Sequence, residues 1–277
     1  MSGFINRLFV VYKPAGIGSN RYLSRIKRKY GIKKAGFSGT LDPFAKGVLI
    51  VAFGQYTKLF QFLKKAPKKY RATLWIGAFS ETLDIEKVST ISIIDKLDES
   101  MIEKTISSLK GEIEYLPPKY SAKKIDGKRA YDLARDNQEF DLKSIKSTIY
   151  EIDFLHYAHP FITFEITISE GGYIRSIAQI IAQKLEVIGT LSALERLYEG
   201  DFVYNNQKEL NPLEYLGLKE NFYLRDKDDM LLGKKLKVES FQFTKDGDYF
   251  INLDTMLAVI TIESDKVTYR LNGVKLC

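Results

Sequence analysis

The sequence predicts an α+β fold with a large N-terminal unit and a small β-rich module at the C-terminal end. Segments typical of strands and of helices are interspersed along the chain without the regular rhythm of a doubly wound sheet. The chain has 277 residues, of which 45% are hydrophobic, so a sizeable core is available. From about residue 223 the pattern changes to short alternating runs split by glycine and aspartate, which favours a separate module.

The first 80 residues predict three strands and two helices. The apolar run 8–12 ends in Lys13-Pro14-Ala15-Gly16, as a strand does when it enters a turn. Residues 20–30 predict a helix that Asn20 can cap, with apolar residues on one side and cations on the other. The sequence predicts a buried strand at 47–53, a short amphipathic helix at 57–65 and an alternating strand at 70–76.

The rest of the chain continues this mixture of elements. Helices are predicted at 98–110, 130–136 and 173–185. Strands are predicted at 147–156, at 161–169 and within 190–202, and an irregular basic and aromatic segment occupies 115–124. The short runs of the tail are predicted strands at 238–243, 249–253, 256–262 and 266–271. These elements predict a unit of residues 1–215 and a β-rich module of residues 223–277.

The charge of the chain is unevenly distributed. Residues 1–80 carry 16 Lys and Arg but a single acid, Asp42, whereas the rest of the chain has a net charge of −8. A proteome rich in lysine would raise lysine everywhere, but it would not remove acids from one stretch only. The asymmetry therefore predicts a basic face on the N-terminal half, with nucleic acid as the first candidate partner.

Composition excludes several other classes of protein. The single cysteine, Cys277, allows no intrachain disulfide, and the two histidines are too few for a metal centre without several carboxylates. The start of the chain lacks the pattern of a signal peptide, and no run approaches the 18 apolar residues of a membrane span. A cytoplasmic protein without membrane contact is expected.

Asp42 has two interpretations. It lies in Gly36-Phe37-Ser38-Gly39-Thr40-Leu41-Asp42-Pro43, and an Asp-Pro pair after Gly-Thr is typical of a turn in which the carboxylate accepts local amides. Alternatively, a lone acid in a basic segment is a reactive group, with its pKa depressed by the surrounding cations. The loop runs directly into the predicted buried strand 47–53, a rigid support of the kind that positions a reactive group.

Arg175 is the second candidate. It lies in the first turn of the helix predicted at 173–185, where the macrodipole favours acids over cations. A cation at this end of a helix requires an anionic partner, which is either a phosphate or a buried carboxylate. An ordinary surface pair with the nearby Glu170 is the alternative.

Aromatic residues stand beside cations at several points. Tyr70 lies in Lys68-Lys69-Tyr70-Arg71, and Tyr120 and Tyr173 have similar surroundings. This combination suits base stacking together with phosphate neutralisation, although any single tyrosine is more often simply half-buried packing.

Five ordered motifs resemble TruB-type tRNA pseudouridine synthases. Residues 36–58 resemble the family's nucleophile segment, which contains Gly-Thr-Leu-Asp-Pro and ends in Thr-Lys. The other four matching segments are Lys13-Pro14, Lys69-Tyr70-Arg71, Pro117-Pro118-Lys119-Tyr120-Ser121-Ala122-Lys123-Lys124, and Tyr173-Ile174-Arg175 followed by Leu194-Glu195-Arg196-Leu197. The likeness spans about residues 8–200.

The resemblance implies a pseudouridine synthase fold with a mixed, largely antiparallel sheet flanked by helices. It implies isomerisation of the uridine called 55 in the T-loop of tRNA, after that base is flipped out of the RNA. Asp42 is then the nucleophile, attacking either the sugar or the uracil ring, and Arg175 is its partner. The other implied site residues are Tyr70, which stacks on the uracil, Tyr173 and Leu194, which line the pocket, and Lys13 and Arg196, which support it. A monomer acting on the tRNA T-arm without cofactor or metal is expected, and by position the tail resembles the family's small RNA-binding PUA domain.

Two departures and two alternatives accompany this resemblance. Phe37 stands where the family usually has His, and Gly172 stands where Thr is common. Phenylalanine at 37 suggests a wedging or stacking residue. A non-catalytic tRNA-binding or tRNA-folding protein on the same scaffold is one alternative, which the combination of Asp42, Tyr70 and Arg175 disfavours. A nucleosidase-like hydrolase is the other, and it predicts free uracil as a product.

Overall fold

A computed structural model describes residues 6–276 apart from 122, 126 and 137. Its main feature is a ten-stranded sheet with the order β14-β1-β3-β12-β4-β11-β10-β7, to which β2 and β13 add on β3 and β12. The strands are β1 (Arg7–Lys13), β2 (Ala35–Ser38), β3 (Lys46–Phe53), β4 (Lys68–Ile76), β7 (Gly111–Tyr115), β10 (Ile145–Ala158), β11 (Phe161–Ile168), β12 (Gly189–Glu199), β13 (Phe202–Val203) and β14 (Glu209–Leu210). Of the strand pairs described in this sheet only β12–β3 is parallel, so the prediction of an α+β fold with a mixed, largely antiparallel sheet is confirmed.

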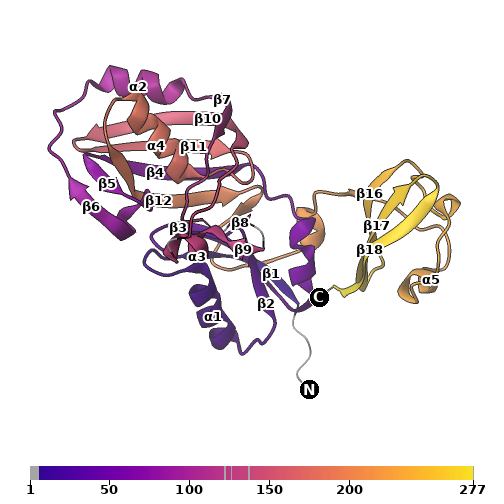
Figure 1. The fold of residues 1–277 in the computed structure, drawn as a ribbon. Coiled ribbons are helices and arrows are strands. Elements are labelled where there is room, and N and C mark those ends of the chain that lie inside the picture. Colours follow the sequence, from indigo (N-terminus) through magenta and orange to yellow (C-terminus); the bar gives the residue numbers. More distant parts are fainter. Residues whose placement is uncertain (1–5, 122, 126, 137, 277) are drawn as a thin grey trace.

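Helices occur between these strands along the chain, and the C-terminal residues form a second, separate sheet to one side of the first (Figure 1). The α-helices are α1 (Ser19–Tyr30), α2 (Glu99–Ser107), α3 (Ala130–Arg135), α4 (Ile174–Lys184) and α5 (Lys227–Leu231). The 3-10 helices are η1 (Gly54–Gln61), η2 (Ile85–Lys87), η3 (Pro212–Tyr215) and η4 (Val238–Ser240). The second sheet is β15 (Lys219–Glu220), β16 (Gly247–Asn252), β17 (Met256–Glu263) and β18 (Lys266–Lys275), and two small hairpins pair β5 (Ala78–Ser80) with β6 (Val88–Ile91) and β8 (Lys124–Ile125) with β9 (Lys128–Arg129).

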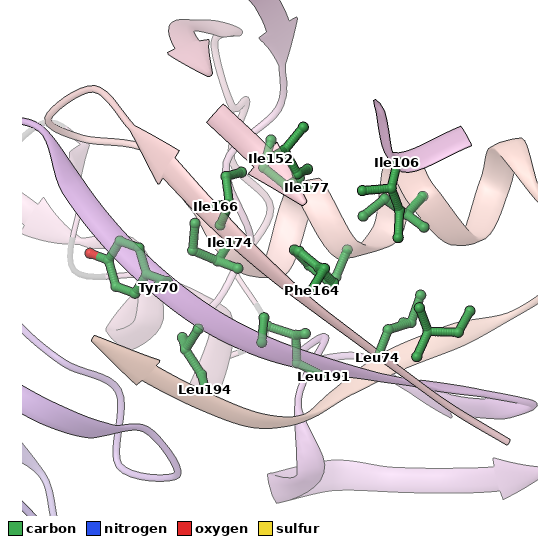
Figure 2. Close-up of a cluster of buried hydrophobic side chains, with 14 of the residues drawn as sticks. Tyr70, Leu74, Ile106, Ile152, Phe164, Ile166, Ile174, Ile177, Leu191 and Leu194 are labelled. Atoms are coloured by element: carbon green, nitrogen blue, oxygen red, sulfur yellow. The ribbon is translucent and has the colours of Figure 1, made fainter. Parts of the chain in front are cut away.

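Helices α2 and α4 pack on one face of the long sheet and close its main core. Apolar residues of β4, β11 and β12 meet the apolar sides of both helices (Figure 2). Ile174 and Ile177 of α4 point into this cluster, and Tyr70 lies at its margin, with its hydroxyl directed away from the isoleucines. The first turn of α4 and the start of β4 are therefore fixed to the same core, which gives a rigid base for side chains at its edge.

Two predicted elements are wrong in type. The amphipathic helix expected at 57–65 is the 3-10 helix η1, which ends at Gln61. The backbone of residues 62–64 pairs with the distant segment 215–217 instead of continuing the helix. Lys64 N donates to Tyr215 O over 3.0 Å, and Gly217 N donates to Phe62 O over 2.8 Å. The strand expected at 238–243 is the short 3-10 turn η4, which buries Val238 and Phe241 in the core of the second sheet.

A separate apolar cluster continues from the first sheet to the second. It begins on β1 and β3 with residues such as Leu8 and Ile50, and passes through Leu59 of η1. It ends on β16–β18 with residues such as Phe250 and Val274. The polar contact from Asn6 Nδ2 to Lys275 O, at 2.8 Å, lies at the same junction. The two sheets therefore share buried surface across η1.

Candidate active site

Asp42 lies on the loop that joins β2 to β3, and the start of α1 holds this loop in place. The Ser19 hydroxyl donates to Leu41 O over 2.8 Å and accepts from Leu41 N over 3.0 Å. Gly16 N donates to Pro43 O over 2.8 Å. The residues before and after Asp42 are thus hydrogen-bonded to the first residue of α1 and to the β1–α1 connection, so the carboxylate is presented by a fixed backbone.

The buried Arg175 guanidinium is the partner of this carboxylate. Its Nε lies 2.9 Å from Asp42 Oδ2, and its Nη1 lies 3.4 Å from Asp84 Oδ2. The same guanidinium donates to Thr82 O over 2.8 Å and to Tyr120 O over 2.9 Å. Glu170, the alternative partner, pairs with another cation instead, since its Oε1 lies 3.4 Å from Lys65 Nζ. A cation in the first turn of α4 therefore has the anionic partner that the macrodipole argument required.

A cavity of about 320 Å³ opens beside this ion pair. Tyr70 of β4, Leu194 of β12 and the half-buried Tyr173 form its apolar part, and the buried Arg196 also lines it. Six of the seven site residues predicted from the sequence therefore share one cavity. Lys13 lies behind the loop instead, fully buried, where its ammonium donates to Ile17 O over 2.7 Å and to Pro43 O over 3.4 Å.

A second cavity, also of about 320 Å³, is lined by the Asp42–Arg175 pair as well. Phe37 of β2 and Tyr131 of α3 line it together with charged side chains, among them Glu86 and Arg135. The two cavities share the Asp42–Arg175 pair as a common wall. The residue that departs from the family pattern therefore borders the site rather than the core alone.

The pKa of Asp42 moves in the direction opposite to the one expected from the sequence. Desolvation by the surrounding residues raises the pKa of this carboxyl above its ordinary value, and Asp84 raises it further, while Arg175 and Lys13 lower it. The expectation of a depressed pKa was wrong because counting cations along the sequence ignores desolvation by the cavity walls. The guanidinium at 2.9 Å is then the contact that favours the ionised form of the carboxyl.

Asp84 is a site residue that the sequence analysis missed. It is buried, and its Oδ1 accepts from Thr82 Oγ1 over 2.6 Å and from Glu86 N over 2.9 Å, so it caps η2 while its Oδ2 faces Arg175. One signal was available. Thr82-Leu83-Asp84 repeats the tripeptide that contains Asp42.

The local packing explains why residue 172 is a glycine. A Cβ at this position would lie 2.5 Å from Ile168 Cδ1 and 2.8 Å from its Cγ1. A threonine here would clash with that isoleucine, which belongs to the main core at the end of β11. The glycine that replaces the threonine common in the family therefore leaves room for the Ile168 side chain.

Lys13 gives the fold a pH dependence. Burial lowers the pKa of Lys13 from 10.5 to about 8, against the opposing attraction of Asp42. Between pH 8 and pH 10.5 the lysine is protonated in the unfolded chain but mostly neutral in the folded protein, so the unfolded chain binds more protons. The free energy of unfolding therefore increases as the pH rises through 8. We expect wild type to gain roughly 2 kcal/mol of stability relative to Lys13→Met between pH 7.5 and 9.5. Urea unfolding of both proteins at the two pH values measures this, and a difference that is independent of pH would contradict it.

No metal centre and no membrane helix are found within the described part of the chain. Its His, Cys, Asp and Glu residues form no group of three or more that could hold a metal ion. Among residues 6–276, apart from the three omitted positions, no helix has the length and apolarity needed to cross a membrane.

Comparison with known proteins gives the family. The TruB family pseudouridylate synthase (N terminal domain) matches residues 27–174. Over 270 residues the chain is 54% identical to tRNA pseudouridine synthase B of a Nitratiruptor species, covering 98% of each. It is 49% identical over 273 residues to tRNA pseudouridine synthase B of Campylobacter jejuni, covering 99% of this chain and 100% of that one.

Solved structures agree on the fold. A chain in an H/ACA RNP bound to a substrate RNA containing 2′-deoxyuridine has a TM-score of 0.67 and 19% identity, covering 98% of this chain and 85% of that one. A chain in a Cbf5-Nop10-Gar1 complex has a TM-score of 0.67 and 20% identity, covering 98% and 84%. At these identities the likeness concerns the fold alone. The sequence matches extend over more than half of the chain for the family segment and over nearly all of it for the relatives, so the chain belongs to the TruB family of pseudouridine synthases, which are isomerases.

Proposed function

We propose that the enzyme converts uridine 55 in the T-loop of tRNA into pseudouridine, with Asp42 as the nucleophile. The observation that carries this proposal is the carboxylate held by Arg175 at the edge of a cavity with Tyr70 and Tyr173 in its wall. The relatives named tRNA pseudouridine synthase B support tRNA as the substrate. The Asp42 side chain is 33% exposed, so it is accessible to a base that enters from solvent.

The reaction follows from these groups. The uridine is first flipped out of the folded loop, which costs a few kcal/mol. The Asp42 carboxylate then attacks either the ribose or the uracil ring, and the bond between the sugar and nitrogen 1 breaks. The base turns, its carbon 5 bonds to the sugar, and the bond to Asp42 breaks, which returns the free carboxylate. The proton on carbon 5 leaves to solvent, and nitrogen 1 of the product takes up one proton from solvent. Atoms are conserved throughout, so neither an oxidant nor a hydrolytic water enters the balance.

The cavity contacts support the following roles for the neighbouring residues. Arg175 orients Asp42 and favours its ionised form, because three further acceptors fix the guanidinium. Tyr70 offers a ring for stacking on the uracil, and Tyr173 and Leu194 complete the apolar wall. Lys13 and Arg196 support the loop from behind and below.

The basic N-terminal half suits an RNA backbone. Helix α1 exposes Arg21, Arg25 and Arg28 and carries no acid in its first turn, and its first residues line the second cavity. Cations of this kind neutralise phosphates without reading sequence. We therefore infer that this basic surface holds the T-arm. The family resemblance adds the proposals of a monomeric cytoplasmic enzyme and of the β-rich module of residues 223–277 as an additional RNA contact.

The test uses T-arm RNA carrying tritium at carbon 5 of uracil. Wild type is expected to release tritium to water without releasing free uracil. Free uracil would indicate the hydrolase alternative, and RNA binding without tritium release would indicate the non-catalytic one. A T-arm in which cytidine replaces the target uridine is the matched control, and undiminished release from it would contradict position 55.

Phe37 is expected to contribute to opening the T-loop. It borders the second cavity beside Asp42, and stacking of an aromatic ring on a base contributes about 1–3 kcal/mol. Phe37→Ala should therefore lower kcat/KM about tenfold, whereas Phe37→His should retain most of it. Kinetics unchanged in both variants would remove Phe37 from the site.

A further inference from the structure

Glu199, at the end of β12, is a buried carboxylate that the reaction described above does not use. Its side chain is completely inaccessible to solvent. Its Oε1 lies 3.1 Å from Lys68 Nζ, and its Oε2 lies 3.2 Å from Arg196 Nη2. All three side chains are buried, so one anion is paired with two cations away from bulk solvent. Burial of a charge is unfavourable unless it is paired, which makes this cluster a specific arrangement rather than a surface pair.

Through Arg196 the cluster reaches both ends of the nucleophile loop. Arg196 Nη2 donates to Gly39 O over 2.8 Å, three residues before Asp42. Arg196 Nε donates to Val48 O over 2.8 Å, at the start of β3 after the loop. A single guanidinium therefore fixes the backbone at the start of the Asp42 loop, just after β2, and the backbone of β3 that follows the loop.

The loop is shaped to admit this cluster. Gly39 has a φ of +66°, and a Cβ at this position would lie 2.8 Å from Glu199 Oε1 and 3.1 Å from Arg196 Nη1. Gly47 has a φ of +115°, and a Cβ there would overlap the backbone oxygen of Arg196. Ser38 Oγ also donates to Glu199 Oε1 over 3.5 Å. The backbone on both sides of the loop thus approaches Glu199 and Arg196 as closely as glycine permits.

Glu199 also restrains cations that face the reaction. Lys68 and Arg196 both line the cavity, where Asp42 is already paired with Arg175. A second cation free to turn toward Asp42 would compete with Arg175 for the carboxylate and withdraw it from the uridine. Pairing with Glu199 directs Lys68 and Arg196 to one side of the cavity.

The geometry points to Glu199 as a positioning residue of the active site. Acting through Arg196 and Lys68, it fixes residues 39–42 so that the Asp42 carboxylate faces the cavity. This rests on the proposed role of Asp42 as nucleophile. Because the Glu199 side chain is buried behind the two cations, it should affect the chemical step more than binding of the RNA.

Full-length Glu199→Gln is the first test, assayed by tritium release. We expect kcat to fall at least about tenfold while KM for T-arm RNA stays within about twofold, since misplacement of a reacting group by about 1 Å can cost 100-fold. Hydrogen exchange should become faster in peptides that cover residues 38–48 and remain unchanged in α2. Glu165→Gln is the matched control, because Glu165 is also held between two cations, Lys69 at 2.8 Å and Arg71 at 2.7 Å, but lies on β11, away from the loop. It should keep kcat and exchange as in wild type.

The double variant Lys68→Met with Glu199→Met separates positioning from charge balance. It removes one cation and one anion, so it keeps the net charge of the cluster and is the variant to use if Glu199→Gln fails to fold. We expect kcat to remain low in it. Recovery of the wild-type kcat would show that Glu199 only balances charge and would overturn the proposal, as would wild-type kcat in Glu199→Gln. A wild-type enzyme that releases no tritium would instead sink the proposed function, so the two failures are distinct.

Discussion

Replacing Asp42 by asparagine is expected to abolish tritium release from T-arm RNA, with a loss of at least about 1,000-fold, or ~4 kcal/mol of transition-state stabilisation. Asparagine has nearly the same shape but no anionic oxygen, so it cannot form the covalent bond to the sugar or to the ring. Arg175 would lose its 2.9 Å ion pair but would keep the carbonyls of Thr82 and Tyr120 and the Asp84 carboxylate.

These remaining contacts make Asp42→Asn a clean test. The fold should persist, and the variant should bind T-arm RNA with an affinity within about threefold of wild type, because the phosphate contacts dominate affinity. Filter binding and thermal unfolding of the variant provide the controls. Release at the wild-type rate by a folded Asp42→Asn protein would exclude Asp42 as the nucleophile.

Arg175→Lys is expected to be the second most severe substitution, with kcat reduced about 100-fold and a lower melting temperature. A lysine ammonium keeps the charge, but it cannot serve four acceptors arranged around a planar fork. Acceptors such as Thr82 O and Tyr120 O would lose their donor, at about 1–3 kcal/mol for each buried group that stays unsatisfied.

The same substitution should change the pH dependence in a defined direction. Arg175 lowers the pKa of Asp42 in opposition to desolvation. Weakening this contact raises the pKa of Asp42 further, so a smaller fraction is ionised at a given pH, and the acidic limb of the rate profile should shift to higher pH. The control is Arg71→Lys on β4, whose guanidinium meets Glu165 at 2.7 Å at an exposed position. It should leave the profile unchanged, and an unshifted limb in Arg175→Lys would refute the role given to this arginine.

Much of the framework could be predicted because its signals are local. Strand β3 is buried on both faces, and its sequence is a continuous apolar run. Strand β4 is buried mainly on one face, and its sequence alternates, so both patterns can be identified from the sequence alone. Arg175 was found because a cation in the first turn of a helix is a local anomaly. Its partner could be named only by resemblance, since Asp42 lies far from Arg175 along the chain and no local pattern brings the two together.

The parts that could not be predicted depend on distant contacts. Helix η1 ends early because the backbone at Lys64 pairs with residue 215, far along the chain. Asp84 was missed because its partner Arg175 lies far along the chain, and no local pattern places the two side chains together. The direction of the pKa shift of Asp42 required the cavity walls, which come from β4, β12 and α4, to be known first.

The apolar cluster that runs from β1 and β3 through η1 to β16–β18 changes how deletion of the tail should be understood. A chain truncated before residue 219 would lose Phe250 and Val274 from the cluster that also buries Leu8 and Leu59. Strand β3 begins directly after the Asp42 loop, and its partner β1 leads into the segment that holds that loop. An inactive truncated protein would therefore be no measure of RNA contacts made by the tail. Point substitutions on the exposed side of β18, which leave Val274 and Phe250 in place, are the cleaner way to ask what that sheet binds.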